Sequence, residues 1–250
     1  MKALITGASS GIGKNIAYEL ARRGIDLIIV ARSKDKLLEI KKNVKVNVEV
    51  LEFDLSILEN VYKLYEKVKN KNIDILINNA GFGLFGLFSE TDLDRELEMI
   101  DLNIKAYHVL TKLFLQDFKK RDSGYILNVC SSAGFMAGPR LSTYYATKNY
   151  VTKLTMAINE ELRHDKSNVV VCALCPGPVN TNFNKVAHGE FSLKEVSPKF
   201  VSEYAIKQMF KKKMIIVPSL SIKLGLFMLR FIPYRWQLNI IYHVQGIKLN

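Results

Sequence analysis

Short apolar runs and longer amphipathic segments alternate along the chain from its first residues. Most of the runs are rich in Ile, Val and Leu, as is typical of parallel strands buried on both faces, and they cover residues 3–6, 26–31, 46–53, 73–78, 124–130, 169–175 and 214–218. Helical spacing predicts helices at residues 14–23, 34–42, 59–70, 91–99, 103–120 and 142–163. This order predicts an α/β fold: a Rossmann-type, doubly wound parallel sheet of about seven strands flanked by helices, with ligands at the carboxyl ends of the strands.

The chain after Pro218 has a different character. Residues 219–232 are almost continuously apolar, Pro233 ends the predicted helix, and a second apolar stretch runs to Val244. We therefore expect a dinucleotide-binding and catalytic domain over residues 1–218. Residues 219–250 are expected to form a helical, basic and apolar C-terminal extension of the same domain.

Charge is distributed unevenly along the chain. The net charge is +12, yet residues 204–250 hold eight Lys or Arg and no Asp or Glu, so residues 1–203, with 28 basic and 24 acidic side chains, carry only +4. A uniformly basic surface would favour a nucleic-acid partner, which we do not expect here. A basic, apolar C-terminal end favours an anionic membrane surface or an anionic ligand. Two other interpretations stay open: these helices can cap a substrate pocket or form a subunit interface.

The three cysteines indicate neither a disulfide framework nor a metal site. Cys172 and Cys175 form a Cys-x-x-Cys pair on a predicted strand, where residues three apart face opposite sides, and the sequence has no second ligand pair. The N-terminus leaves no room for a signal peptide, and no apolar run reaches the roughly 18 residues of a spanning helix. These features predict a cytoplasmic protein without a metal, with peripheral membrane contact through residues 211–250 as an open alternative.

A glycine-rich loop joins the first predicted strand to the first helix. Its glycines have the spacing Gly-x-x-x-Gly-x-Gly. Backbone amides at the start of a helix attract phosphate, and glycines permit a close approach that side chains would block. We expect the loop to hold the pyrophosphate of a dinucleotide through Gly7, Ser9, Ser10, Gly11, Ile12 and Gly13.

The end of the second strand carries cations where a carboxylate would select NAD(H). An Asp or Glu roughly 20 residues after the loop ordinarily holds the ribose 2′-hydroxyl. Here the chain has Arg32 and Lys34 and no acid at the strand end. A guanidinium can pair with a 2′-phosphate, so we expect NADP(H) to be favoured over NAD(H).

A tyrosine and a lysine at helical spacing supply the candidate acid–base chemistry. Tyr144 and Lys148 share one helix face, and a nearby ammonium is expected to lower the pKa of a phenol. Ser131, at the end of the fifth predicted strand, could hold the same substrate oxygen. Tyr145 is the competing tyrosine, but the residue four positions further on is Asn149, which carries no charge.

Together these motifs resemble the short-chain dehydrogenase/reductase superfamily. The similarity covers roughly residues 1–218 and includes, in the family's order, the glycine loop, residues 78–81 (Asn-Asn-Ala-Gly), Ser131, Tyr144-x-x-x-Lys148 and Pro176-Gly177. The resemblance implies that Tyr144 is the general acid and base and that Lys148 lowers its pKa and binds the nicotinamide ribose. It implies that Ser131 orients the substrate carbonyl.

Further roles come from the resemblance alone. Asn103 matches the residue that supports a proton relay to the lysine. Besides the glycine loop and Arg32, the cofactor would be contacted by Asp54, Asn79, Ala80, Gly81, Tyr144, Lys148, Pro176, Gly177, Val179 and Thr181. The resemblance also implies a homo-oligomer.

Apolar side chains near the strand ends favour a lipophilic substrate. In the family, the segment at residues 182–199 covers the substrate, and here it carries Phe183, Val186, Phe191 and Leu193, although a packed surface helix would show the same pattern. We expect an NADPH-dependent oxidoreductase that reduces a carbonyl, or reversibly oxidises a secondary alcohol, on a 3-oxoacyl, steroid-like or other hydrophobic ketone or aldehyde. Two alternatives remain: a nucleotide-binding interaction protein at a membrane surface without turnover, and isomerase or dehydratase chemistry on the same fold.

Overall fold

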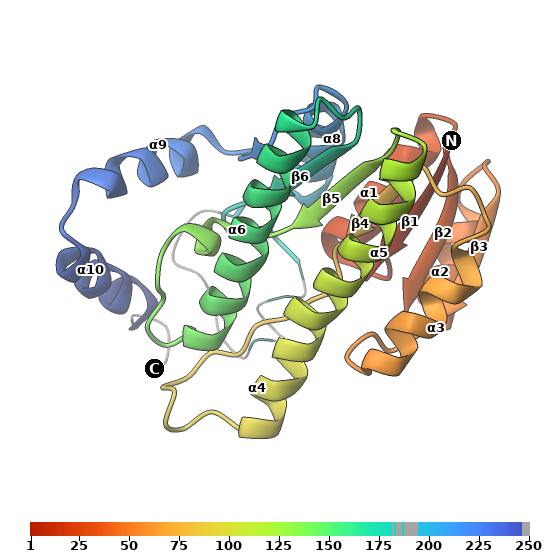
Figure 1. Ribbon diagram of the computed structural model, residues 1–250. Helices are drawn as coiled ribbons and strands as arrows, with labels where there is room; N and C mark the ends of the chain where they lie inside the picture. The colour runs from red at the N-terminus through yellow and green to blue at the C-terminus, as the bar shows by residue number, and fades with distance from the viewer. Residues whose placement is uncertain (182, 184–186, 188–194, 247–250) are drawn as a thin grey trace.

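A parallel sheet of seven strands forms the centre of the computed structural model, which describes residues 1–181, 183, 187 and 195–246. The strand order is β3-β2-β1-β4-β5-β6-β7 (Figure 1). The strands are β1 (Lys2–Thr6), β2 (Asp26–Ala31), β3 (Val48–Glu52), β4 (Ile75–Asn78), β5 (Tyr125–Val129), β6 (Val170–Leu174) and β7 (Ile215–Ile216). The order reverses between β1 and β4, where a doubly wound sheet binds its ligand. This confirms the predicted fold class.

Two helical layers cover the sheet, because successive side chains of each strand point to opposite faces. Ala3 and Ile5 of β1 belong to a buried cluster with α1 (Gly11–Arg22), α2 (Lys34–Lys42) and α8 (Pro198–Phe210). Leu4, between them, belongs to the opposite cluster, with α3 (Leu58–Val68), α5 (Tyr107–Lys120) and α6 (Ser142–His164). The near-continuous apolar character of the strands follows from burial on both sides.

The structure refines two helical segments. A π-helical turn, η1 (Asp101–Ala106), connects α4 (Leu93–Ile100) directly to α5, and Asn103 lies in this turn rather than at the start of a new helix. Helix α8 was not predicted, although its signal is present in the sequence. Ser197 accepts a hydrogen bond from the Phe200 amide at 3.1 Å, and a proline occupies the first turn.

The chain ends in two helices that lie beside α6 and away from β1, β2 and β3 (Figure 1). They are α9 (Leu220–Met228), which continues into the 3₁₀ turn η3 (Leu229–Phe231), and α10 (Tyr234–Gly246). We call residues 220–246 the C-terminal arm. Among the described residues, no helix combines the length and apolar character needed to cross a bilayer.

The lysine cluster at residues 211–213 is not part of this arm. These lysines are exposed and precede β7, whereas the arm follows it. Because β7 runs parallel to β6, the lysines lie at the amino ends of the strands, whereas the arm starts at the carboxyl ends. At the amino ends, Lys212 interacts electrostatically with Asp122. The basic side chains of residues 211–250 therefore fall into two separate groups, the lysine cluster before β7 and those of the arm after it.

Candidate active site

One cavity of about 1030 Å³ lies at the carboxyl ends of the strands. Most of the residues predicted to bind cofactor or to act in catalysis line it: Gly7, Ser9, Ser10, Gly11, Ile12, Arg32, Asp54, Asn79, Ala80, Gly81, Ser131, Tyr144, Lys148, Pro176, Gly177, Val179 and Thr181. Gly13 and Asn103 are not among the lining residues, so any role they have is indirect.

The glycine loop is held in shape by close backbone contacts. Gly7 has a φ of +62°, and a Cβ on Gly13 would lie 2.4 Å from the Gly7 carbonyl oxygen, so neither position suits a side chain. The Asn79 amide donates to the carbonyl oxygens of Thr6 and Gly7, both at 3.0 Å. Helix α1 begins inside the loop, at Gly11, which aims its free amides at the cavity. This arrangement fits the pyrophosphate of a dinucleotide.

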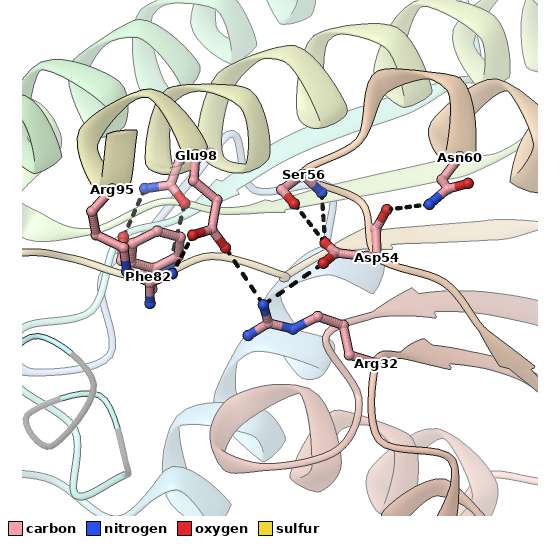
Figure 2. Close-up of polar contacts among 8 residues, drawn as sticks. Arg32, Asp54, Ser56, Asn60, Phe82, Arg95 and Glu98 are labelled. Atoms are coloured by element: carbon pink, nitrogen blue, oxygen red, sulfur yellow. Dashed lines mark hydrogen bonds and ion pairs between the residues drawn. The ribbon is translucent and has the colours of Figure 1, made fainter. Parts of the chain in front are cut away.

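Arg32 lies at the end of β2 between two carboxylates (Figure 2). Its guanidinium is 3.4 Å from a carboxylate oxygen of Glu98 and 3.8 Å from one of Asp54. Asp54 also accepts hydrogen bonds from the amide and hydroxyl of Ser56, at 3.0 and 2.7 Å. The Arg32 side chain is 59% exposed, so these pairs are weak and the guanidinium can turn to another anion.

Two charged residues at this end of the cavity have no counterpart among the predicted site residues. Glu98 comes from α4, 66 residues further along the chain, and no local pattern connects the two. Lys36 lines the cavity, whereas Lys34, which the sequence analysis considered, does not. The signal for Lys36 is its position, because it lies in the first turn of α2, which starts at Lys34 directly after the end of β2.

The predicted catalytic side chains converge at the end of β5. Tyr144 is 8% exposed and Lys148 4% exposed, and the Lys148 ammonium lies 5.8 Å from the centre of the Tyr144 ring. Lys148 donates a hydrogen bond to the Val129 carbonyl oxygen at 2.9 Å. The Ser131 hydroxyl accepts from the Ala133 amide at 3.1 Å and also contacts the Tyr144 hydroxyl. The three side chains therefore share one pocket, as the sequence predicts.

Burial controls the ionisation of this pair. Desolvation raises the pKa of Tyr144 well above its ordinary value, and the contact with Ser131 opposes this rise. Desolvation also lowers the pKa of Lys148 to about 8, although the neighbouring Cys130 and Cys175 act in the other direction. Burial is thus the largest influence on the pKa of each side chain, and the lowering of the Tyr144 pKa by Lys148 stays a prediction.

Asn103 acts from behind the cavity wall. Its amide nitrogen donates to the Phe82 carbonyl oxygen at 2.9 Å and to the Thr147 hydroxyl at 3.1 Å, and its amide oxygen accepts from the Phe82 backbone at 3.2 Å. A Cβ on Gly81 would lie 2.7 Å from this oxygen. Asn103 thus connects the strand end after β4 to α6, the helix that carries Tyr144 and Lys148.

The other half of the cavity is mainly apolar and is lined in part by the C-terminal arm. The arm contributes Ile222, Leu226, Met228, Leu229, Ile232 and Ile241. Near its end, the Gln245 side chain donates to the Tyr145 hydroxyl at 2.6 Å. Gln245 is 6% exposed and also lines the cavity, and its amide oxygen has no hydrogen-bond partner in the described part of the chain.

Only part of the predicted lid can be compared with the structure. The Phe183 ring lies 5.2 Å from the Tyr144 ring, centre to centre, and lines the cavity. Asn182, Val186, Phe191 and Leu193 lie outside the described residues.

The Cys-x-x-Cys pair is not arranged as a redox or metal pair. Cys172 and Cys175 are buried and pack in different clusters, on opposite faces of the sheet, as strand geometry predicts. Within the described ranges, no group of three or more His, Cys, Asp or Glu side chains could hold a metal ion.

Comparison with known proteins agrees with the fold and the motifs. The sequence profile described as short chain dehydrogenase matches residues 1–190. An uncharacterized oxidoreductase of Staphylococcus saprophyticus is 35% identical over 210 residues, which cover 82% of this chain and 88% of that protein. The human very-long-chain 3-oxoacyl-CoA reductase is 34% identical over 214 residues, covering 82% of this chain and 67% of the human protein. A solved short-chain dehydrogenase from Sphingobium yanoikuyae in complex with NADPH is 30% identical, with a TM-score of 0.84 and 92% of each chain covered.

These matches define the class of protein. The chain belongs to the short-chain dehydrogenase family. It is an oxidoreductase of that family, with a fold that binds a nicotinamide dinucleotide and a small-molecule substrate.

Proposed function

We propose that the protein uses NADPH to reduce the carbonyl of a lipophilic substrate and catalyses the reverse oxidation of the secondary alcohol. The observation that carries this proposal is the course of the cavity, which leads from the glycine loop past Tyr144 to the apolar lining of the arm. Its polar half suits a dinucleotide and its apolar half a hydrophobic chain or ring system. The name of the human relative makes a 3-oxoacyl thioester the first substrate to test.

The proposed roles follow from the positions of the side chains. Bound NADPH would supply the hydride. Tyr144 donates a proton to the carbonyl oxygen as it gains charge, and Ser131 hydrogen-bonds the same oxygen. Lys148, held by the Val129 carbonyl oxygen, places a positive charge beside the Tyr144 phenol. It would also bind the nicotinamide ribose of the cofactor. Asn103 positions α6 and the strand end rather than contacting substrate.

The preference for NADPH rests on Arg32 and Lys36, the cations that line the cavity at the end of β2. Both can approach a 2′-phosphate. Glu98 and Asp54 beside Arg32 moderate the preference, because they compete for the guanidinium.

Paired tyrosine variants test the mechanism. Tyr144→Phe removes the proton donor, so we expect kcat to fall by roughly 10² to 10⁴-fold while NADPH affinity is kept. Tyr145→Phe is the matched control, because it removes a hydroxyl from the adjacent residue, and it should retain most of the turnover. Ketones, aldehydes, 3-oxoacyl thioesters and ketosteroids are compared by NADPH and NADH consumption. Full turnover in Tyr144→Phe would refute the mechanism, and substrate loss without NADPH consumption would indicate an isomerase or dehydratase.

A further inference from the structure

The helix α9 with its turn η3 is apolar on two opposite sides. Ile222, Leu226 and Leu229 recur at helical spacing and line the cavity. On the opposite side, Leu224 and Phe227 are 60% and 52% exposed, and Leu220 and Phe231 continue this row. A helix that is apolar on all sides is ordinarily buried on all sides. The outer side of α9 is exposed instead, so its composition indicates contact with another apolar surface.

The exposed apolar side chains gather on the arm. In the described part of the chain, 21 large hydrophobic side chains are exposed, and ten of them fall within residues 220–246. Three of them, Met228, Ile240 and Val244, also line the cavity. The other seven do not: Leu220, Leu224, Phe227, Phe231, Tyr234, Trp236 and Tyr242. Such a concentration of exposed apolar surface marks a site of association.

The charge of the arm identifies what it can meet. Lys223, Arg230 and Arg235 are exposed on it, and residues 204–250 contain no Asp or Glu. Two arms packed face to face in a symmetric dimer would bring like charges together without a carboxylate to neutralise them. An anionic lipid surface satisfies both features, because it accepts apolar side chains and attracts the basic ones.

We propose that the outer face of the C-terminal arm docks on an anionic lipid bilayer and lies in its interface. Leu224, Phe227 and Phe231 enter the acyl region, and Trp236 and Tyr234 lie at the headgroup level, where amphipathic rings are favoured. The inner face of the same helix lines the cavity, so docking places the apolar end of the cavity against the membrane. That this serves substrate entry rests on the proposed function, but docking itself does not.

Co-sedimentation of the full-length protein with vesicles tests docking independently of turnover. Phosphatidylcholine vesicles with about one third phosphatidylglycerol should bind the protein at low salt, and binding should weaken with added salt or without the anionic lipid. Replacing Lys223, Arg230 and Arg235 with glutamine should lower the partition coefficient on the order of a hundredfold, since each charge contributes about a fivefold factor at such a surface. The control replaces the exposed lysines 41, 42 and 45, distant from the arm, and should change binding less than twofold.

A second variant tests the apolar contribution. Leu224→Glu with Phe227→Glu changes side chains that do not line the cavity, and it should abolish binding while circular dichroism and NADPH affinity stay unchanged. Ile57→Glu, at a comparably exposed position on the start of α3, should bind as the unmodified protein does. The proposal would be overturned if the Leu224→Glu, Phe227→Glu variant bound the vesicles as well as Ile57→Glu does. A dimer that forms without lipid and is lost with Leu224→Glu and Phe227→Glu would also overturn it. Failure of every carbonyl substrate would sink the proposed reaction and leave docking standing.

Discussion

The cation at the end of β2 gives the sharpest test of cofactor preference. Arg32→Ala removes a guanidinium that lines the cavity and whose present partners are Glu98 and Asp54, at 3.4 and 3.8 Å. A charge-assisted hydrogen bond to a phosphate contributes about 1.5 to 3 kcal/mol. Because the Arg32 side chain is 59% exposed, solvent screening favours the lower end of this range. We therefore expect NADPH to bind roughly tenfold more weakly, since about 1.4 kcal/mol corresponds to a factor of ten.

The decisive quantity in this experiment is the ratio of NADPH to NADH affinity rather than the affinity for NADPH alone. The dissociation constants of NADPH and NADH are measured by fluorescence titration, and kcat/KM is measured with each cofactor. NADH lacks the 2′-phosphate, so its affinity should change by less than about twofold. Lys34→Ala is the control, because Lys34 neighbours Arg32 in sequence but does not line the cavity. An equal loss with both cofactors would refute the assignment of Arg32 to the 2′-phosphate.

Glu98 extends the same reasoning to a double-mutant cycle. Its carboxylate competes for the Arg32 guanidinium and would repel a nearby phosphate. Glu98→Gln should therefore increase NADPH affinity several-fold in the unmodified background. In the Arg32→Ala background the gain should be smaller, because only the repulsion is relieved.

Three further changes test the site and the folded state. Gly13→Ala places a Cβ 2.4 Å from a loop carbonyl oxygen, so NADPH affinity measured by titration should fall at least about tenfold; Gly225→Ala, whose Cβ meets no atom within 4 Å, should keep it. Between about pH 8 and 10.5 the buried Lys148 binds fewer protons in the folded protein than in the unfolded chain. The contribution of this group therefore raises the free energy of unfolding as the pH rises. Urea unfolding at two pH values within that window should show a gain of about 1.4 kcal/mol per pH unit over Lys148→Met, and parallel curves would contradict the cause assigned to the lowered pKa. Gln245→Leu removes the hydrogen bond to Tyr145, so KM for a bulky ketone should change while NADPH affinity does not; a matching change in NADPH affinity would place Gln245 at the cofactor instead.

The sequence predicts the sheet well because its signal is local. Each strand is a short run of apolar residues, and burial on both faces makes that run visible without knowledge of its neighbours. The boundaries differ by one or two residues: the predicted strand at residues 46–53 is observed at Val48–Glu52, although Asn47 and Phe53 still hydrogen-bond to β2 through their backbones. The π-helical turn around Asn103 leaves no comparable signal, since its extra residue per turn depends on packing against the strand end after β4.

The candidate site shows the same division. Tyr144 and Lys148 are four residues apart in one helix, so their proximity could be predicted from spacing. The direction of their pKa shifts could not, because it depends on burial that many distant residues create together. The contact between Gln245 and Tyr145 spans 100 positions in the chain, and that between Arg32 and Glu98 spans 66. Such pairs become visible only when the fold places their elements side by side.

The C-terminal arm explains why the sequence left several interpretations open. An amphipathic helix identifies its buried side by its polar one, but α9 has apolar residues on both sides, so its pattern does not distinguish a pocket cap from an interface. The structure assigns the inner side, because Ile222 lies against Gly177 and lines the cavity. The two interpretations therefore do not exclude each other, since a helix that closes the pocket with one face still presents Leu224 and Phe227 outward with the other. If both faces work together, a substitution on the outer face should change the KM for a membrane-dissolved substrate and leave that for a water-soluble one unaltered.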